Sequence, residues 1–404
     1  MFIDIQRKSD VYGTIQNLPS SKSISNRSLL LSALAGNQSV VSNLSSARDT
    51  RLMQTLIGSP DKLIDVMDAG TTMRFLTAYF ALTGKNKTLT GTERMRQRPI
   101  ALLVNALRTI GVTIEYVEKD GFPPIETKGF NQQKANTVSL PGDVSSQYIS
   151  ALMMMAPVLP QGLTILIEGH IGSRPYIDMT ASLMKTFGIN CDFKGQSIQI
   201  PNGSYQSASL TVEADWSAAS YWFAFTALAE RAELILPHVS RQSLQGDRAI
   251  VEVMENLGVK ANFKGGSAFL TKRAHSNSVE WNFADCPDLA QTVLPVCAAK
   301  GIQGSFTGME SLRIKETDRI AALQTELAKI GARLTEEKAG LWKLNPGKFF
   351  GPIKIQTYHD HRMAMGLAPL ASLMDLRIED PDVVNKSYPG FWDDMRAIGF
   401  KLLS

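Results

Sequence analysis

The chain has 404 residues, 44% of them hydrophobic and 20% charged, which allows two domains with substantial cores and excludes a disordered chain. Its net charge of +4 is mild, whereas a nucleic-acid-binding protein usually carries a denser basic surface. The start of the chain lacks the apolar core of a signal peptide, and no apolar run reaches the roughly 18 residues of a membrane span. We therefore expect a cytoplasmic protein with neither nucleic acid nor membrane as a partner.

The first strong signal along the chain is a helix that begins near Lys22. A polar, basic head with Lys22, Ser23 and Arg27 runs directly into a body rich in Leu and Ala. Because that body is apolar almost all round, the pattern predicts a buried helix. The free N–H groups and the positive dipole end of such a helix favour an anion at its N-terminus.

The same pattern recurs six times along the chain. The heads of these helices begin at Lys22, Gly70, Ser145, Asp215, Asp288 and His361. Each apolar body is followed by a short strand and then by a second helix that ends in glycine, which predicts a left-handed glycine cap. The six glycines are Gly58, Gly111, Gly188, Gly258, Gly331 and Gly399.

Four of the second helices lead into pairs of alternating segments with a glycine between them, which predicts β-hairpins. These pairs span 112–126, 189–200, 259–270 and 332–344. The repeating unit is thus helix, strand, helix and hairpin, about 70 residues in all, and it indicates an α/β architecture. The first repeat is the weakest, because the segment between Gly58 and Gly70 is too short for a hairpin.

Lys and Arg gather at the helix starts, where the helix dipole makes a cation mildly unfavourable. The buried-helix heads carry Lys22, Ser23, Arg27, Gly70, Arg74, Ser145, Ser146, Gln147, Asp288, His361 and Arg362. The second helices add Arg96–Arg98, Ser173–Tyr176, Arg313–Arg319 and Lys386. Taken singly, each is more simply an N-cap or a surface charge. Their corresponding places in the repeats favour a bound polyanion instead.

Two carboxylates, Asp288 and Glu316, fall inside this cationic set, which would keep them ionised and ready to accept or orient a proton. His359 and His361 would share one face of a strand, but no third ligand cluster follows and Arg362 opposes a cation. We therefore expect no metal. The three cysteines form no CxxC pair and lie in apolar or ordinary surroundings, so we expect a reduced compartment and structural rather than nucleophilic thiols.

Nine segments, in this order, resemble signature segments of the EPSP synthase family and cover about residues 20–392: SKSISNR, GTTMR, RMRQRPI, SSQYISALMMMAP, SRPYID, PDLAQT, LRIKETDR, DHRMAM and KSYPGFW. The resemblance implies a two-domain inside-out α/β barrel of six βαβαββ repeats, three per domain. The domains would be 21–212 and 1–20 with 213–404, joined by two hinge strands. Asp68, Phe75 and Ser311 stand where this family commonly has Asn, Pro and Asn, and 59–68 is shortened.

The resemblance also implies a reaction. The enolpyruvyl group of phosphoenolpyruvate would pass to the 5-hydroxyl of shikimate 3-phosphate through a tetrahedral intermediate, releasing phosphate, in the shikimate pathway of aromatic amino acid biosynthesis. No metal and no organic cofactor would be needed, and the enzyme would be a monomer whose partners are these two small molecules. Because both substrates are polyanions, the reaction would explain the cations at the helix starts.

The family motifs carry site residues over to matching positions. The shikimate 3-phosphate contacts would be Lys22, Ser23, Arg27, Ser145, Ser146, Gln147, Ser173, Tyr176, Asp288 and Lys315. The phosphoenolpyruvate contacts would be Lys22, Gly70, Arg98, Gln147, Arg319, Arg362 and Lys386. Asp288 would accept the hydroxyl proton and Glu316 would protonate the methylene carbon, with Lys22 also placed to move protons. His361 would assist Glu316 or position phosphate.

Three other functions compete with this one. The sibling enolpyruvyl transferase acts on UDP-N-acetylglucosamine, but it typically carries a reactive loop cysteine, and none of the three cysteines here fits that role. A non-catalytic phosphoanion-binding protein would have lost the acid–base pair, yet Asp288 and Glu316 are both present. An RNA-end-processing enzyme of a similar repeat fold would be expected to have a denser basic surface.

Overall fold

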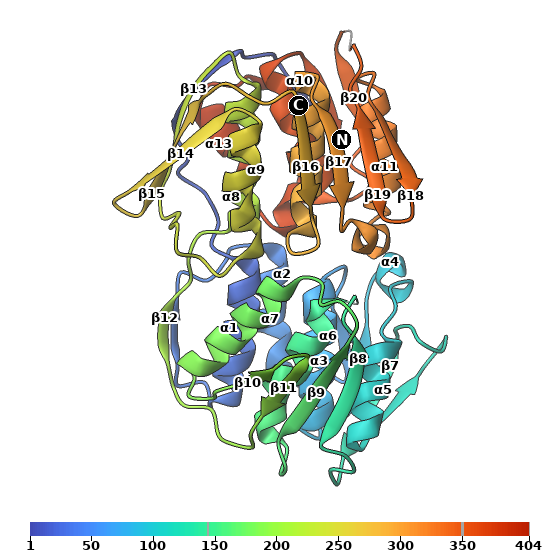
Figure 1. The fold of residues 1–404 in the computed structure, drawn as a ribbon. Coiled ribbons are helices and arrows are strands. Elements are labelled where there is room, and N and C mark those ends of the chain that lie inside the picture. The colour runs from blue at the N-terminus through green and yellow to red at the C-terminus, as the bar shows by residue number, and fades with distance from the viewer. Residues whose placement is uncertain (144, 349–350, 404) are drawn as a thin grey trace. The chain divides into compact units, whose positions relative to one another are not determined.

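The computed structural model describes residues 1–143, 145–348 and 351–403. The chain divides into two compact units (Figure 1). Unit 1 comprises Met1–Ser21, Ser46–Arg48 and Glu213–Ser404, and unit 2 comprises Lys22–Ser45 and Asp49–Val212. Each unit mixes helices with strands around its own hydrophobic core, so the expected α/β class is confirmed.

The helices of unit 2 are of two kinds, as the repeats predict. The apolar-bodied helices are α1 (Lys22–Leu34), α3 (Gly70–Leu82) and α6 (Ser146–Met155). The others are α2 (Arg48–Ile57), α4 (Glu93–Arg96), α5 (Ala101–Ile110), α7 (Arg174–Thr186) and the 3-10 turn η1 (Ala156–Val158). Every residue of α3 except Thr71 is buried. A helix with no polar face is stable only inside the fold, and α3 packs against both α1 and α6.

Unit 1 repeats this division. Its apolar-bodied helices are α8 (Trp216–Leu228), α10 (Ala290–Lys300) and α12 (His361–Leu367). The other helical segments are α9 (Ile250–Asn256), α11 (Arg319–Ala328), α13 (Phe391–Ala397), η2 (Gly246–Ala249), η3 (Pro287–Leu289), η4 (Glu310–Ile314), η5 (Ala368–Ser372) and η6 (Pro381–Lys386). The aromatic body of α8 anchors the core, where Trp222 stacks on Phe225 with ring centroids 5.2 Å apart.

Five sheets of four strands share one topology among the described residues. In each, the first two strands are parallel and the remaining neighbours are antiparallel; the strand orders are β4-β5-β7-β6, β8-β9-β11-β10, β2-β13-β15-β14, β16-β17-β19-β18 and β20-β21-β1-β22. In four of them a buried helix directly connects the parallel pair, which is the βαβ unit. A sixth, two-stranded sheet pairs β3 with β12 in parallel.

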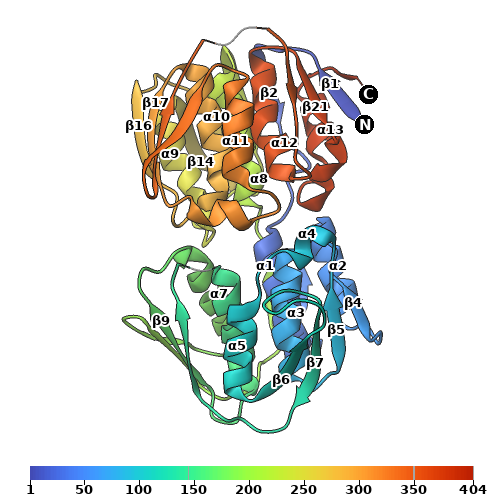
Figure 2. The same cartoon turned by 90° about the vertical axis from the view of Figure 1, so that its right-hand side faces the viewer.

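The strands of unit 2 are β3 (Val40–Ser42), β4 (Leu63–Asp65), β5 (Lys87–Thr90), β6 (Val112–Tyr116), β7 (Ile125–Phe130), β8 (Thr137–Pro141), β9 (Leu163–Glu168), β10 (Asp192–Lys194), β11 (Ser197–Ile200) and β12 (Ser209–Thr211). Those of unit 1 are β1 (Phe2–Ile5), β2 (Asp10–Thr14), β13 (Arg231–Leu236), β14 (Val259–Lys264), β15 (Ser267–Lys272), β16 (Ser278–Asn282), β17 (Gln303–Thr307), β18 (Arg333–Lys338), β19 (Leu341–Asn345), β20 (Ile353–Ile355), β21 (Leu376–Glu379) and β22 (Leu402–Leu403). Within each unit the strands lie outside and the apolar-bodied helices lie inside (Figure 2).

The four predicted hairpins are confirmed as the antiparallel pairs β6/β7, β10/β11, β14/β15 and β18/β19. Five of the six predicted glycine caps have the expected positive φ, namely Gly111, Gly188, Gly258, Gly331 and Gly399. The prediction is wrong at Gly58, whose φ is not positive. The chain leaves α2 there through a turn in which the Ser59 N–H donates to the Leu56 carbonyl, and this turn needs no left-handed residue.

The first repeat has no hairpin, as its short length indicates. Its segment after Gly58 instead forms β4, which pairs in parallel with β5 and so joins the sheet of the next repeat. The last sheet draws its strands from both ends of the chain, because β1 lies between β21 and β22. In the described part of the chain, no helix is both long and apolar enough to cross a bilayer.

Candidate active site

The centre of the polar cluster in unit 1 is Arg319, the first residue of α11. Its side chain is only 2% exposed and contacts three carboxylates. The guanidinium lies 2.8 Å from Asp288, 3.0 Å from Glu316 and 2.7 Å from Asp360. Burial opposes the charge of Arg319, but Asp360, Glu316 and Asp288 outweigh that cost and raise its pKa. One buried cation therefore fixes the relative positions of three acidic groups.

Local sequence explains why these groups meet. Asp318 caps α11 by accepting hydrogen bonds from the N–H groups of Ile320 and Ala321, and Asp360 caps α12 by accepting from the N–H of Arg362. Capping residues of this kind satisfy otherwise unpaired N–H groups and fix where a helix begins. Two helix starts are thus held at defined places, and Arg319 links them through Asp360.

Asp288, in η3 ahead of α10, is surrounded by cations. Besides Arg319, the Arg362 guanidinium lies 3.0 Å from its second oxygen and the Lys315 ammonium lies 3.6 Å away. Burial raises the pKa of Asp288, but Arg362, Lys315 and Arg319 together lower it well below its usual range. The cations around Asp288 therefore favour its ionised state, as we predict.

Glu316 lies between two cations. One of its oxygens is 3.0 Å from Arg319 and the other is 3.1 Å from the ammonium of Lys386, at the end of η6. The side chains of Lys386 and Arg319 are buried, whereas that of Glu316 is 14% exposed. Glu316 can therefore exchange a proton with a small molecule while buried neighbours hold its position.

In unit 2, Arg27 on α1 is a buried cation whose hydrogen bonds within the described residues go to neutral groups. It donates to the Thr180 hydroxyl at 2.7 Å, to the Ser150 hydroxyl at 3.0 Å and to the Ser23 carbonyl at 3.0 Å. Burial lowers its pKa to about 10, partly offset by Tyr176. A cation held in this way is well suited to an incoming anion, because an anion would lower the cost of its burial.

The helix starts of unit 2 bring further predicted residues together. The Gln147 amide donates to the Thr71 hydroxyl at 3.1 Å, which links the starts of α6 and α3. The Ser145 side chain caps α6. The guanidinium of Arg98 lies against Gly70, so closely that a methyl group on Gly70 would come within 2.8 Å of it. Arg98 can approach the start of α3 because that position lacks a side chain.

The structure thus groups the predicted residues by unit. Unit 1 gathers Asp288, Lys315, Glu316, Arg319, Arg362 and Lys386 in one network. Unit 2 carries Lys22, Ser23, Arg27, Gly70, Arg98, Ser145, Ser146, Gln147, Ser173 and Tyr176 at or near the starts of its helices. Sequence reasoning missed Asp49, which pairs with Lys22 at 3.0 Å. Its only sequence signal is an acidic residue in the first turn of α2.

The suggestion that His359 and His361 share a strand face is wrong. Asp360 between them is a helix cap, so His361 begins α12 and is buried, whereas His359 is exposed and contacts Asp380. The two imidazoles therefore diverge. Among residues 1–143, 145–348 and 351–403, no group of acidic, His and Cys side chains could hold a metal ion.

The cysteines are buried or half-buried and unpaired. Burial raises the pKa of Cys191 to about 12 and that of Cys286 to about 12, and it also raises the pKa of Cys297. Thiols of this kind are poor nucleophiles, in agreement with the structural role that we predict.

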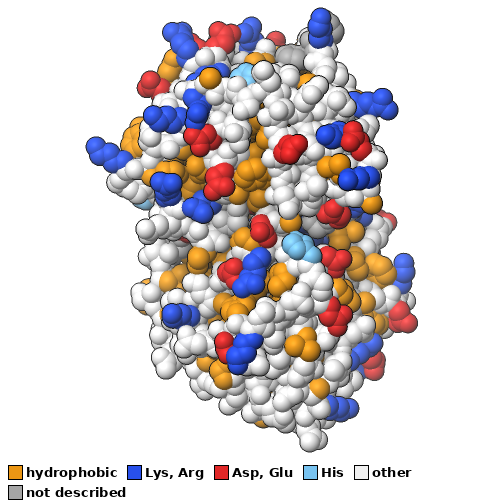
Figure 3. Space-filling view, viewed as in Figure 1, with side chains coloured by type: hydrophobic (Ala, Val, Ile, Leu, Met, Phe, Trp, Pro, Cys, Tyr) orange, Lys and Arg blue, Asp and Glu red, His pale blue; other side chains and the backbone are white. Residues whose placement is uncertain are grey.

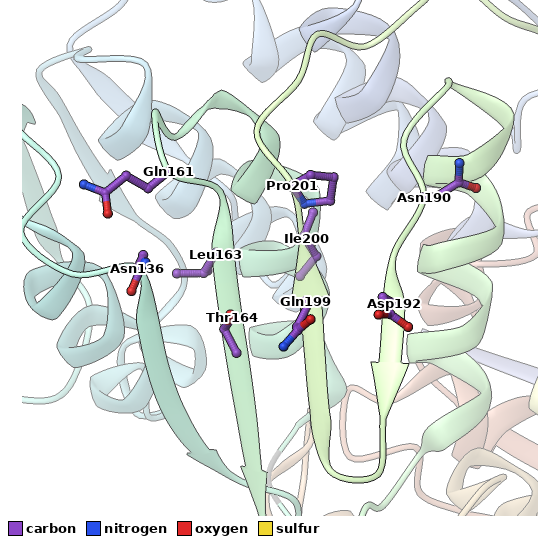
Figure 4. A pocket seen from close by; sticks show the side chains of 9 residues that line it. All are labelled: Asn136, Gln161, Leu163, Thr164, Asn190, Asp192, Gln199, Ile200 and Pro201. Carbon is purple, nitrogen blue, oxygen red and sulfur yellow. The ribbon is translucent and has the colours of Figure 1, made fainter.

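Two surface features lie apart from these residues. An open hollow of about 530 Å³ on unit 2 is lined by Asn136, Gln161, Leu163, Thr164, Asn190, Asp192, Gln199, Ile200 and Pro201 (Figure 4), and none of the predicted site residues lines it.

On the face seen in Figure 3, basic and acidic side chains are interspersed. That face is therefore unlike the continuous basic surface that binds nucleic acid.

Comparison with known proteins gives a consistent result. The profile of the family described as EPSP synthase (3-phosphoshikimate 1-carboxyvinyltransferase) matches residues 5–61 and 55–395. The 3-phosphoshikimate 1-carboxyvinyltransferase of Bacteroides fragilis strain ATCC 25285 is 46% identical over 398 residues, 97% of this chain and 96% of that protein. The protein of the same name from Idiomarina loihiensis is 35% identical over 428 residues, 98% of each chain. The solved EPSP synthase of Acinetobacter baumannii shares the fold, with a TM-score of 0.77, 20% identity and 100% coverage of both chains.

Proposed function

Because the chain belongs to the EPSP synthase family, we propose that it transfers the enolpyruvyl group of phosphoenolpyruvate to the 5-hydroxyl of shikimate 3-phosphate and releases phosphate. This reaction is a step of the shikimate pathway that leads to the aromatic amino acids. The observation that carries the proposal is the buried network in which Asp288 and Glu316 share Arg319. It supplies two carboxylates and several cations in one place, as an addition to an anionic enol ether requires.

In the addition step, the 5-hydroxyl oxygen forms a bond to the central carbon of phosphoenolpyruvate. Asp288, ionised in its cationic surroundings, takes up the hydroxyl proton, and Glu316 gives a proton to the methylene carbon. Anionic groups of the substrate that engage Arg319 and Lys386 would compete with Glu316 for these cations. Glu316 would then hold a proton more readily and could serve as the proton donor.

The second step reverses the proton movement at carbon. A proton leaves the methyl group of the tetrahedral intermediate and returns to Glu316, the carbon–carbon double bond forms again, and the bond to the phosphate oxygen breaks. The departing phosphate takes the proton that Asp288 accepted in the first step. The cations Arg362, Lys386 and Arg98 are proposed to stabilise the departing phosphate and the carboxylate. His361 is proposed to assist Glu316 or to position phosphate. Lys22, paired with Asp49, is proposed to contact both substrates and to move protons.

We propose that shikimate 3-phosphate is bound mainly by the helix starts of unit 2. Arg27 supports this proposal, because its buried charge is hydrogen-bonded to neutral groups and would be stabilised by the phosphate of the substrate. The remaining proposed contacts are Ser23, Ser145, Ser146, Gln147, Ser173 and Tyr176, with Asp288 and Lys315 from unit 1. Hydroxyl, amide and backbone N–H groups suit the many acceptor oxygens of a phosphorylated sugar-like acid.

The finer architecture is also part of the proposal. We propose an inside-out α/β barrel of six βαβαββ repeats, three in domain 21–212 and three in the domain formed by 1–20 with 213–404, joined by two hinge strands. The shared strand order of the sheets supports the repeats. The enzyme is proposed to act as a cytoplasmic monomer without metal or organic cofactor.

Mass analysis of the product tests the proposed reaction. We expect incubation with both substrates to yield a compound whose mass equals the sum of the two substrates minus phosphoric acid. The control reaction omits shikimate 3-phosphate and should leave phosphoenolpyruvate intact. Formation of an adduct with UDP-N-acetylglucosamine instead would replace the proposed acceptor by the sibling enzyme's acceptor.

A further inference from the structure

Asp247 is a buried carboxylate outside the proposed catalytic set. It lies in η2, just before α9, and is only 2% exposed. One of its oxygens accepts a hydrogen bond from the Ser217 hydroxyl. Its other oxygen, Oδ1, is buried without a hydrogen-bond partner in the described structure. Burying a carboxylate in this way is unfavourable for folding, so its presence calls for a functional reason.

The Ser217 hydroxyl connects Asp247 to the proposed active site. Ser217, in the first turn of α8, lies 3.2 Å from the Nη2 atom of Arg362. A guanidinium can only donate hydrogen bonds, so the hydroxyl oxygen accepts from Arg362. Its single proton is then free to be donated to Asp247. The polarity of the hydroxyl is thus set by the acceptor behind it.

The same nitrogen of Arg362 also contacts Asp288. The distance from Nη2 to the Asp288 carboxylate is 3.0 Å, and Nη1 lies 3.4 Å from the Tyr221 hydroxyl. Nη2 therefore lies within contact distance of both Ser217 and Asp288. If the Ser217 hydroxyl turned away, Arg362 would lose a hydrogen bond. Its guanidinium could then shift and weaken the ion pair with Asp288.

We propose that Asp247 is a positioning residue for the enolpyruvyl transfer: by accepting the proton of Ser217, it holds the Arg362 guanidinium in place against Asp288. The inference rests on the proposed function, since Arg362 is there a phosphoenolpyruvate contact and Asp288 the proton acceptor. Asp247 itself touches neither substrate in this account. Its effect passes through Ser217 to Arg362.

Burial and the charged neighbours of Asp247 make the hydrogen-bonded chain from Asp247 through Ser217 to Arg362 sensitive to pH. Burial raises the pKa of Asp247 to about 6, and Asp288 and Asp215 add to the rise, while Arg362 and the Ser217 hydrogen bond lower it. Cys286 also lies nearby, but its thiol is neutral at physiological pH because burial raises its pKa to about 12. Asp247 therefore changes from neutral to ionised between about pH 5 and 7.

Asp247→Asn is the informative variant, because Asn keeps the shape but cannot ionise, so it offers Ser217 only a neutral and weaker acceptor than the carboxylate. At pH 7.5 we expect kcat/KM for phosphoenolpyruvate to fall by about 10- to 100-fold, because a small displacement of a substrate-binding residue such as Arg362 has an effect of that size. KM for shikimate 3-phosphate should change less, because most of its proposed contacts lie in unit 2. Ser217→Ala should produce a similar loss, the double variant should lose no more than either single variant, and Ser217→Thr should recover most of the activity.

The pH profile separates positioning from a purely structural role. A protonated Asp247 is electrically equivalent to Asn, so the ratio of wild-type to Asp247→Asn activity should shrink toward one as pH falls from 7.5 to 5. Phosphate groups of the substrates titrate near pH 6 as well, but they affect both enzymes equally and cancel in the ratio. A ratio that is constant with pH would overturn the proposal.

A stability measurement checks the same residue without any substrate. A carboxyl whose pKa is higher in the folded than in the unfolded state binds extra protons when folded, so stability declines as pH rises from about 4 to 6. Asp247→Asn should therefore have a higher Tm than the wild type at pH 7.5 and lose that advantage near pH 4. A lower Tm at pH 7.5 would contradict a buried, ionised Asp247.

Glu326→Gln is the matched control. Glu326 is a buried carboxylate of the same unit that contacts Lys329 and Tyr358. This variant should lower stability without changing the pH dependence of activity. If the wild type releases no phosphate with shikimate 3-phosphate, the proposed function fails, whereas an active wild type with a fully active Asp247→Asn variant at pH 7.5 overturns only the role of Asp247.

Discussion

At the scale of single residues, the candidate site depends on buried cations that orient carboxylates. Arg319 contacts Asp288, Glu316 and Asp360 while almost fully buried. Removing one partner of such a network leaves an uncompensated buried charge, which is costly. Conservative substitutions that keep size and hydrogen bonds are therefore the best probes, since they separate the chemistry of a side chain from its packing.

Glu316→Gln should keep substrate binding and lower kcat by about 10²- to 10⁴-fold, the range expected for loss of a general acid. The amide retains the shape of Glu316 but cannot give its proton to carbon. Titration calorimetry with shikimate 3-phosphate and steady-state kinetics would check this. Glu337→Gln, at an exposed carboxylate of β18, is the control and should be fully active. An active Glu316→Gln enzyme would remove Glu316 from the mechanism.

Gly70→Ala should weaken phosphoenolpyruvate binding with little loss of stability. The new methyl group would come within 2.8 Å and 2.9 Å of the two terminal nitrogens of Arg98. These atoms are the end of a flexible side chain, so the guanidinium would move rather than the backbone. KM for phosphoenolpyruvate should rise several-fold while Tm changes by less than about 2 °C. An unchanged KM would argue against Arg98 as a phosphoenolpyruvate contact.

At the scale of helices and strands, the sequence predicts the apolar-bodied helices, the strands that follow them and the four hairpins, because these depend on local periodicity. It does not predict Asp49, Asp247 or Ser217 as neighbours of the site. Each is an ordinary polar residue at a helix start, and only tertiary packing reveals its partner. The error at Gly58 has a similar origin, since the sequence does not show which hydrogen bonds end a helix, and here a turn from Ser59 to Leu56 ends α2.

Close packing of α10 on α12 gives a prediction at this scale. A methyl group on Gly366 would come within 2.2 Å of the Gln291 carbonyl oxygen. Because the clash is with backbone, the helices would have to separate, and Gly366→Ala should cost about 1–3 kcal/mol of unfolding free energy. Gly58→Ala, in open space without a positive φ, is the control and should be neutral or slightly stabilising. Equal urea midpoints for the two variants would contradict the packing argument.

At the scale of the whole molecule, segments far apart in the sequence complete single sheets. β1 lies between β21 and β22, and β2 pairs with β13. The chain passes from unit 1 into unit 2 near Ser21 and returns near Glu213, and an antiparallel bridge joins Ser20 to Ala214. Between these points only Ser46–Arg48 returns to unit 1, so each unit keeps its own core while the chain stays continuous.

The proposed reaction draws groups from both units, so binding should change the molecule as a whole. We expect shikimate 3-phosphate to raise Tm, because a ligand that binds only the folded state stabilises it, and to reduce the radius of gyration in small-angle scattering. Inorganic sulfate at matched ionic strength is the control for a general anion effect. A radius of gyration that stays constant at saturating ligand would contradict the expected compaction.

The decisive experiment measures phosphate release from phosphoenolpyruvate, with shikimate 3-phosphate and UDP-N-acetylglucosamine as parallel acceptors. We expect stoichiometric release with shikimate 3-phosphate, none with the nucleotide sugar, and none without an acceptor. Release only with the nucleotide sugar would retain the fold and the phosphoenolpyruvate contacts but contradict the proposed substrate. No release with either acceptor would contradict the proposed enzyme activity itself.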